Sequence, residues 1–260
     1  MKNLNLMFAC VLCLSLLNSC SKTDIESDSE ISDNLTNTYL EETPNTLEIV
    51  IEEDETIIDN EAFKILSLGD SYTIGQSVCS TCNFPVQLQD SLTRNLDSIP
   101  FSVDIIAQTG WTTTNLINAV NTQAVYSNYD LVTLLIGVNN QYQNKPFELY
   151  ETEFPLLLDK AIFLANGNKT NVIVLSIPDY AYTPFGNEDP QISEEIDTYN
   201  AFAENYCNQN EVKFVHITDI TRQGIAQPNL VAPDGLHPSK IAYSRFVERL
   251  LPDVLPLVTN

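Results

Sequence analysis

The chain has 260 residues, of which 43% are hydrophobic, and its 35 acidic residues against 12 basic ones give a formal net charge of −23. Contacts to nucleic acid phosphates depend on Lys and Arg, so this balance argues against a nucleic acid partner, and an anionic lipid surface would also repel the chain. Beyond the N-terminal segments described next, roughly 200 residues remain, which suits one globular domain with a substantial core.

The N-terminus resembles a bacterial lipoprotein signal. Lys2 supplies positive charge, residues 6–17 form an apolar stretch too short to span a bilayer as a mature helix, and Leu-Asn-Ser-Cys ends at Cys20 like a lipobox. The resemblance implies cleavage of residues 1–19 and lipidation of the Cys20 thiol. The mature protein would then be exported and anchored by lipid in the cell envelope, facing the periplasm or the cell surface. An ordinary secretory signal is the alternative.

Residues 20–60 are expected to form an acidic, flexible tether. From Ser21 to Asn60 there are 13 carboxylates against Lys22 as the single basic residue, and such a composition cannot bury enough apolar surface to fold. The segment 46–58 is the exception, because its spaced Leu and Ile side chains are compatible with an edge strand. We therefore place the folded domain at residues 61–260.

Strands and helices are predicted to alternate through this domain. Five runs rich in β-branched and aliphatic residues are continuous rather than alternating, as expected of strands covered on both faces. Helical spacing appears between them, in the segments 88–96, 192–203 and 242–250. The pattern predicts an α/β fold, a three-layer α/β/α sandwich around a central parallel sheet of about five strands. The predicted strands are Phe63–Leu68, Ser102–Ala107, Leu131–Ile136, Val172–Ile177 and Val212–Ile217.

Polar motifs fall at the ends of these predicted strands. Gly69-Asp70-Ser71 follows the first strand, Gly110 the second and Gly137–Asn140 the third, while Asp234–His237 lies on a late loop before the last helix. Sites in open parallel sheets lie at the carboxyl ends of the strands. We therefore expect the four segments to converge on one rim.

Three residues in these segments can supply the nucleophile, the base and the base-orienting carboxylate of a serine hydrolase. A serine hydroxyl such as that of Ser71 is a poor nucleophile until a base removes its proton, and histidine suits that task near neutrality. The chain has two histidines. His216 lies in a predicted strand, where we expect a hydrogen-bonded core residue. His237 is therefore the candidate base, and Asp234, three residues earlier, can accept the Nδ1 proton and leave Nε2 facing the serine.

Taken one at a time, these blocks are also compatible with turns or helix caps. Together and in this order they resemble the SGNH or GDSL hydrolase family, over nearly the whole folded domain. The resemblance implies a flavodoxin-like fold, with Ser71, His237 and Asp234 as a catalytic triad. It also implies an oxyanion hole made by the backbone N–H groups of Ser71 and Gly110 and the side-chain amide of Asn139.

The chain departs from the family pattern at one position. The third block of the family is Gly-x-Asn-Asp, and Asn140 stands where that block usually has an acid. The other common serine hydrolase pattern, Gly-x-Ser-x-Gly, is absent because Thr73 occupies the place of its second glycine. The α/β-hydrolase fold is therefore disfavoured.

The cysteines of the folded domain allow three interpretations. Cys79 and Cys82 form the motif Cys-Ser-Thr-Cys, and in an exported protein such a pair favours a small loop-closing disulfide. Two thiols are too few for structural zinc, and a thiol-redox site is the other alternative because the pair lies between a strand and a helix. Cys207 is expected to be a buried small apolar residue. The sequence contains no metal constellation and no phosphate-cradling glycine loop, so neither a metal nor a cofactor is expected.

The expected function is serine-dependent hydrolysis of carboxylic esters through an acyl-enzyme. The substrate would carry an acetyl or other short acyl group on a carbohydrate or lipid, and membrane contact would be through the lipid anchor only. Trp111 and the segment 178–185 could line an acyl or sugar subsite, although ordinary packing is equally compatible with their aromatic side chains. The alternative from another class is a catalytically inactive binding or adhesion lipoprotein that keeps the same fold.

Overall fold

The computed structural model describes residues 61–123 and 128–259. All of them belong to the second of two units into which the chain divides, Thr56–Asn260. The predicted signal (1–19), the tether (20–60) with its lipidation site at Cys20, and the edge strand expected within 46–58 lie outside the described residues.

The centre of the described domain is a five-stranded sheet in the order β2-β1-β3-β4-β5. Every neighbouring pair is parallel, which confirms the predicted sheet. Strand β1 lies between β2 and β3, so the chain adds β2 on one side of β1 and then crosses over to add β3 on the other side. In open parallel sheets, ligands bind at the point where the strand order reverses in this way. The strands are β1 (Phe63–Gly69), β2 (Phe101–Ala107), β3 (Leu131–Leu135), β4 (Val172–Leu175) and β5 (Lys213–Val215).

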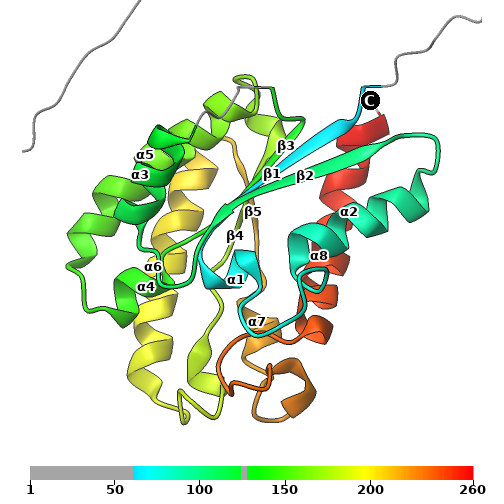
Figure 1. Ribbon diagram of the computed structural model, residues 1–260. Coiled ribbons are helices and arrows are strands. Elements are labelled where there is room, and N and C mark those ends of the chain that lie inside the picture. Colours follow the sequence, from blue (N-terminus) through cyan, green and yellow to red (C-terminus); the bar gives the residue numbers. More distant parts are fainter. Residues whose placement is uncertain (1–60, 124–127, 260) are drawn as a thin grey trace, which may run out of the picture. The chain divides into compact units, whose positions relative to one another are not determined.

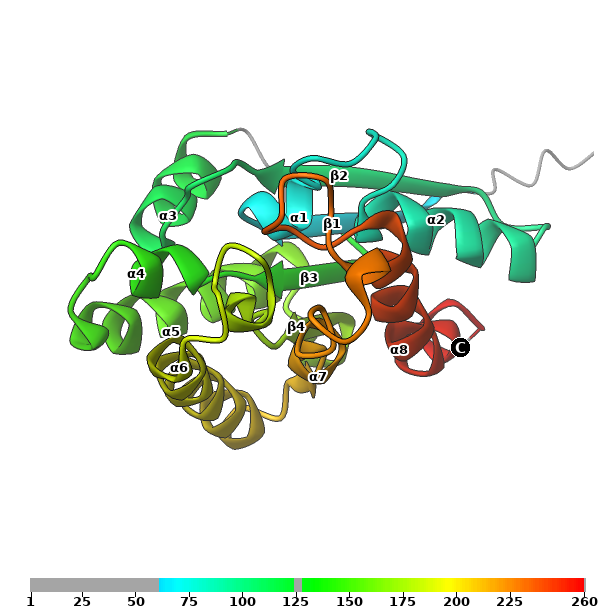
Figure 2. The same ribbon diagram turned by 90° about the horizontal axis from the view of Figure 1, so that it is seen from below.

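Helices cover both faces of the sheet, which confirms the three-layer architecture. Helices α2 and α8 lie on one face and α3, α5 and α6 on the other (Figure 1). The short helices α1, α4 and α7 lie at the end of the sheet where the strands terminate, as the two views show (Figures 1 and 2). The helices are α1 (Ser71–Ile74), α2 (Phe84–Asn95), α3 (Thr113–Thr122), α4 (Val138–Tyr142), α5 (Phe147–Leu164), α6 (Pro190–Gln209), α7 (Thr218–Thr221) and α8 (Lys240–Thr259), with 3-10 turns at Lys169–Asn171, Tyr180–Tyr182 and Pro228–Leu230.

The core follows the central strands. All residues of β3 and β4 are buried, and so is β1 from Ile65 onward, as expected of strands covered on both faces. That expectation is wrong for β2, where Ser102 and Asp104 are exposed, and for β5, where Lys213 is exposed. Both are edge strands, so fewer helices cover them.

The expectation that His216 is a core residue is also wrong. Strand β5 ends at Val215, and the His216 side chain is 57% exposed. Its Nε2 lies 3.0 Å from Oε1 of Glu204 on α6. Because the observed strand is three residues shorter than the predicted Val212–Ile217, His216 lies beyond the end of the strand and pairs at the surface.

Within residues 61–123 and 128–259, no helix has the length and apolar character needed to cross a membrane.

Candidate active site

Ser71 is placed by the turn that joins β1 to α1. Asp70 is the N-cap of α1, and its Oδ1 accepts a hydrogen bond of 3.0 Å from the backbone N–H of Tyr72. Ser71 is the first residue of the helix and is buried. Because the first N–H groups of a helix have no acceptor within the helix, the backbone at Ser71 is suited to bind an anion at this point.

Asp234 and His237 form a pair on the loop before α8. The Nδ1 atom of His237 lies 2.6 Å from Oδ2 of Asp234. The other carboxylate oxygen, Oδ1, accepts the backbone N–H groups of Leu236 and His237, each at 3.0 Å. The loop therefore folds around the carboxylate, and the imidazole is held through Nδ1 with Nε2 turned away from Asp234.

The Asp234 carboxyl is held in its ionised form. Burial alone would raise its pKa, but hydrogen bonds from the Ser77 hydroxyl, from His237 and from two backbone N–H groups lower the pKa well below its usual value. Asp234 is therefore a carboxylate throughout the neutral pH range.

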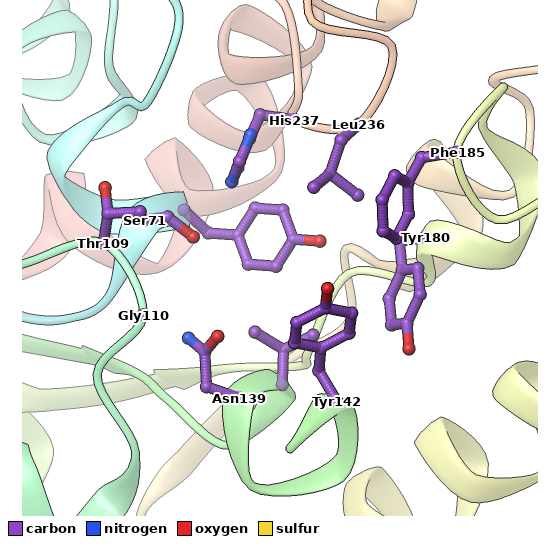
Figure 3. A pocket seen from close by; sticks show the side chains of 11 residues that line it. Ser71, Thr109, Gly110, Asn139, Tyr142, Tyr180, Phe185, Leu236 and His237 are labelled. Atoms are coloured by element: carbon purple, nitrogen blue, oxygen red, sulfur yellow. The ribbon is translucent and has the colours of Figure 1, made fainter.

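Ser71 and His237 face the same cavity of about 210 Å³. Figure 3 shows Ser71 between the His237 ring on one side and Asn139 on the other. Within the described part of the chain there is no hydrogen bond between the Ser71 hydroxyl and His237, and such catalytic contacts commonly tighten only when substrate binds. The cavity is lined by Ser71, Tyr72, Thr109, Gly110, Val138, Asn139, Tyr142, Tyr180, Phe185, Leu236 and His237.

Gly110 reaches this cavity from the end of β2. Its φ of +84° lies in the left-handed region, which favours glycine, and a Cβ built on it would meet no atom within 4 Å. The carbonyl of Gly110 accepts a hydrogen bond of 2.9 Å from Nε2 of Gln143. The backbone at this position is thus open to the cavity and is fixed by Gln143, the residue that caps the C-terminus of α4.

Asn139 connects three of the converging segments. It lies on α4, after β3, and its Nδ2 donates to the carbonyl of Trp111 at 3.0 Å and to Oδ2 of Asp70 at 3.4 Å. The second contact is long, so that amide hydrogen is weakly held. The side chain is therefore fixed chiefly by Trp111.

Asp70 is fully buried beneath this arrangement. Desolvation raises the pKa of its carboxyl to about 7, and hydrogen bonds from the Tyr72 backbone and from Asn139 offset only part of that effect. A carboxyl close to the cavity can thus be neutral near pH 7.

Asn140, the position that departs from the family pattern, points away from the cavity into the protein. It is fully buried, and its side chain bonds both the backbone N–H and the hydroxyl of Thr113, the first residue of α3. The Thr113 hydroxyl in turn donates to Glu153 on α5. The acid of this region is thus supplied from α5 rather than from the motif.

Several residues at the site were not predicted from the sequence. Tyr142 lines the cavity and is 53% exposed; its position three residues after Asn139, nearly one helical turn, was the available signal. Leu236 lines it because it precedes His237 on the same loop. From the segment 178–185, Tyr180 and Phe185 line the cavity, whereas Trp111 does not and packs partly buried against the core.

Cys79 and Cys82 form a disulfide in the loop between α1 and α2, with their Cα atoms 5.0 Å apart. Cys207 is free and buried, and burial raises the pKa of its thiol to about 12, which makes it unreactive. Among the residues that the structure describes, no group of three or more His, Cys, Asp and Glu side chains is arranged to hold a metal ion.

The sequence profile of the GDSL-like Lipase/Acylhydrolase family matches residues 67–245, a range that includes all four converging segments. The chain belongs to this family. Membership in the GDSL-like family makes it a hydrolase that acts on ester bonds, and the inactive binding module is not supported. No curated protein matches the chain.

Solved structures share the fold. TesA is 18% identical to this chain over 75% of this chain and 99% of its own, with a TM-score of 0.59. The lipase Lip_vut3 from a goat rumen metagenome is 16% identical over 74% of this chain and 97% of its own, with a TM-score of 0.61. The acetylxylan esterase Axe2 from Geobacillus stearothermophilus is 18% identical over 74% and 94%, with a TM-score of 0.56. At these identities the likeness shows the GDSL-like fold alone.

Proposed function

We propose that the chain hydrolyses carboxylic esters through an acyl-enzyme on Ser71, with His237 as base and then acid and without a cofactor. The observation that carries this proposal is the position of Ser71 and His237 on one cavity, with His237 held by Asp234 at 2.6 Å. A nucleophile, a base and a group that orients the base are the parts that acyl transfer to serine requires.

The proposed reaction has two steps. As Oγ of Ser71 bonds to the ester carbonyl carbon, Nε2 of His237 takes its proton; the tetrahedral intermediate then expels the alcohol, which receives that proton. In the second step His237 takes a proton from water, whose oxygen attacks the acyl carbon. The second tetrahedral intermediate then expels Oγ of Ser71, which receives that proton from His237, and the carboxylic acid is released. Asp234 keeps its charge throughout and stabilises the imidazolium.

The negative oxygen of each tetrahedral intermediate needs donors fixed in advance. We assign these to the backbone N–H groups of Ser71 and Gly110 and to Nδ2 of Asn139. Asn139 supports this role because one of its amide hydrogens is held only by a 3.4 Å contact to Asp70, while its bond to Trp111 keeps the side chain in place. The oxyanion would take over the weakly held hydrogen.

The cavity supports a short acyl group. Its volume of about 210 Å³ is small, and its walls are largely apolar side chains. At its rim, Tyr142 and Phe185 are each about half exposed, with ring centroids 6.1 Å apart. Exposed aromatic rings suit the apolar face of a sugar or a lipid chain, and one protein of similar fold, Axe2, is an acetylxylan esterase. We therefore propose acetyl or other short acyl esters of carbohydrate or lipid as substrates.

We further propose that the protein is exported and anchored by lipid on Cys20, with residues 20–60 as a tether. Support comes from the signal-like sequence of residues 1–20 and the acidic composition that follows. The mass of the mature protein tests this, because a lipidated terminus at Cys20 is expected and an unmodified one would end the anchoring proposal.

Turnover by the purified full-length chain tests the enzymatic proposal. We expect hydrolysis of p-nitrophenyl acetate that falls as the acyl chain lengthens, and release of acetate from acetylated glycans. Ser71→Ala should abolish both, whereas Ser80→Ala, at an exposed serine outside the cavity, should leave them unchanged. Equal rates for wild type and Ser71→Ala would refute the proposal.

A further inference from the structure

The loop between α1 and α2, residues 75–83, touches the candidate active site at two points. The loop is closed on itself by the Cys79–Cys82 disulfide and lies beside the segment that carries Asp234 (Figure 2). Neither point of contact has a role in the reaction as proposed above.

The first contact is with Asp234, the carboxylate that orients His237. The hydroxyl of Ser77 donates a hydrogen bond of 2.6 Å to Oδ2 of Asp234, the same oxygen that holds Nδ1 of His237. Since Oδ1 is already held by two backbone N–H groups, Ser77 completes the set of donors that fix the carboxylate plane. Its bond is to an ionised group, and such bonds are stronger than neutral ones.

The second contact is with Thr109, next to the proposed oxyanion donor Gly110. Gln76, the residue before Ser77, accepts through Oε1 a hydrogen bond of 2.6 Å from the hydroxyl of Thr109. Thr109 lines the cavity and precedes Gly110, a proposed donor to the oxyanion. Two consecutive residues of one loop therefore hold the base-orienting group and the Gly110 segment together.

The backbone of the loop is fixed in a way that presents these side chains. Ser77 has a φ of +65°, in a region where a residue other than glycine or asparagine is uncommon and pays a conformational cost. Asn83 anchors the loop by donating to the carbonyls of Ile74 at 3.2 Å and Ser80 at 3.1 Å. The disulfide bridges this anchored turn, with the backbone N–H of Cys82 bonded to the carbonyl of Cys79.

We propose that Ser77 and Gln76 are positioning residues for ester hydrolysis, held in place by the Cys79–Cys82 disulfide. This inference rests on the proposed function of Ser71, His237 and Asp234. Reduction by a dithiol converts the disulfide to two thiols while the reagent forms its cyclic disulfide. The freed loop then holds Asp234 and the Gly110 segment less firmly, and turnover falls.

The test compares Ser77→Gly with Ser80→Ala in the full-length chain. Glycine removes the hydroxyl and relieves the positive φ, so the variant should fold, which thermal unfolding checks. We expect kcat to fall about tenfold with KM within about twofold of wild type, as for a lost hydrogen bond to a charged group. The downfield proton resonance of His237 Nδ1 should move in Ser77→Gly and stay in place in Ser80→Ala, which a merely structural role would not produce.

A second arm tests the part played by the disulfide. Dithiol should lower the wild-type rate but change the rate of Ser77→Gly much less, because two changes that act through one contact are not additive. The double variant Cys79→Ser, Cys82→Ser should match the reduced wild type and should not respond to dithiol. Equal losses on reduction in wild type and Ser77→Gly would overturn the proposal, as would wild-type kinetics in Ser77→Gly.

The Ser71→Ala variant separates this inference from the function on which it rests. If Ser71→Ala is inactive and Ser77→Gly is fully active, only the positioning role fails. If Ser71→Ala retains the wild-type rate, the proposed function itself fails.

Discussion

Asn140 and Thr113 exchange two hydrogen bonds where α4 meets α3. Oδ1 of Asn140 accepts the Thr113 backbone N–H at 2.9 Å, and Nδ2 donates to the Thr113 hydroxyl at 2.6 Å. Because that hydroxyl receives a donor, its own hydrogen is free to bond Glu153. The Asn140 amide, the Thr113 hydroxyl and the Glu153 carboxylate thus form one chain of hydrogen bonds, in which the amide donates to the hydroxyl and the hydroxyl donates to the carboxylate.

Asn140→Asp should therefore destabilise the protein, although an acid is usual in this block of the family. In the variant, the new carboxylate at position 140 and the carboxylate of Glu153 would both face the Thr113 hydroxyl. That hydroxyl has a single hydrogen and can donate to only one of them. We expect a loss of about 1–3 kcal/mol in the free energy of unfolding, measured by urea denaturation. Adding Glu153→Gln should recover part of the loss, because the new amide can supply a donor. A single variant as stable as wild type would contradict this network.

Two glycines with positive φ should respond differently to alanine. At Gly110 a Cβ meets open space, so Gly110→Ala should cost only about 1–2 kcal/mol of backbone strain while lowering kcat/KM. At Gly137 the Cβ would lie 2.7 Å from Tyr150 and 2.8 Å from Ile177, both buried. Gly137→Ala should therefore cost about 3 kcal/mol or more. Thermal and urea unfolding measure both, and equal losses would contradict the structure.

Asp70 predicts a pH dependence of stability. Its folded pKa of about 7 lies above the ordinary value of 3.8, so the native state keeps a proton that the unfolded state has released. The contribution of protonated Asp70 to the free energy of unfolding is complete below about pH 4. It is lost as the pH rises to about 7, the folded-state pKa. Relative to Asp70→Asn, the wild type should lose roughly 3–4 kcal/mol over that range. Parallel stability curves in urea titrations from pH 4 to pH 8 would be evidence against a buried, protonated Asp70.

Asn139→Ala should lower kcat by about 100- to 1,000-fold, with a much smaller effect on KM, since it removes a donor used mainly in the transition state. The matched control is Asn118→Ala, at an exposed asparagine of α3 that does not line the cavity. Steady-state kinetics on p-nitrophenyl acetate make the comparison. Equal kinetics for the two variants would remove Asn139 from the oxyanion hole.

The sheet could be predicted from the sequence because its central strands are continuous apolar runs, as in Leu131–Leu135, and the alternation with helices leaves few topologies. The edges were harder. The run from Val212 to Ile217 is apolar in composition, yet only Lys213–Val215 pairs in the sheet, and His216 is at the surface. Composition does not show where pairing with a neighbouring strand ends.

Within the site, residues carried by motifs could be placed in advance, because the carboxyl ends of parallel strands meet at one rim. Ser77 could not, since its bond to Asp234 joins positions 157 residues apart and depends on the local turn of a disulfide-closed loop. Phe185 belongs to a segment that the sequence offered as a possible subsite lining, but which side chains of that segment reach the cavity depends on the path of the loop. Long-range contacts of irregular segments have no periodicity in the sequence.

The central claim is that Ser71 carries the acyl group. A reaction with p-nitrophenyl acetate, stopped by acid during turnover and digested, allows the peptide that contains Ser71 to be weighed. We predict that one acetyl group is found on Ser71 in the wild type, and that both the modified peptide and turnover are absent in Ser71→Ala. An acetyl group on a different residue, or undiminished turnover in Ser71→Ala, would contradict the account.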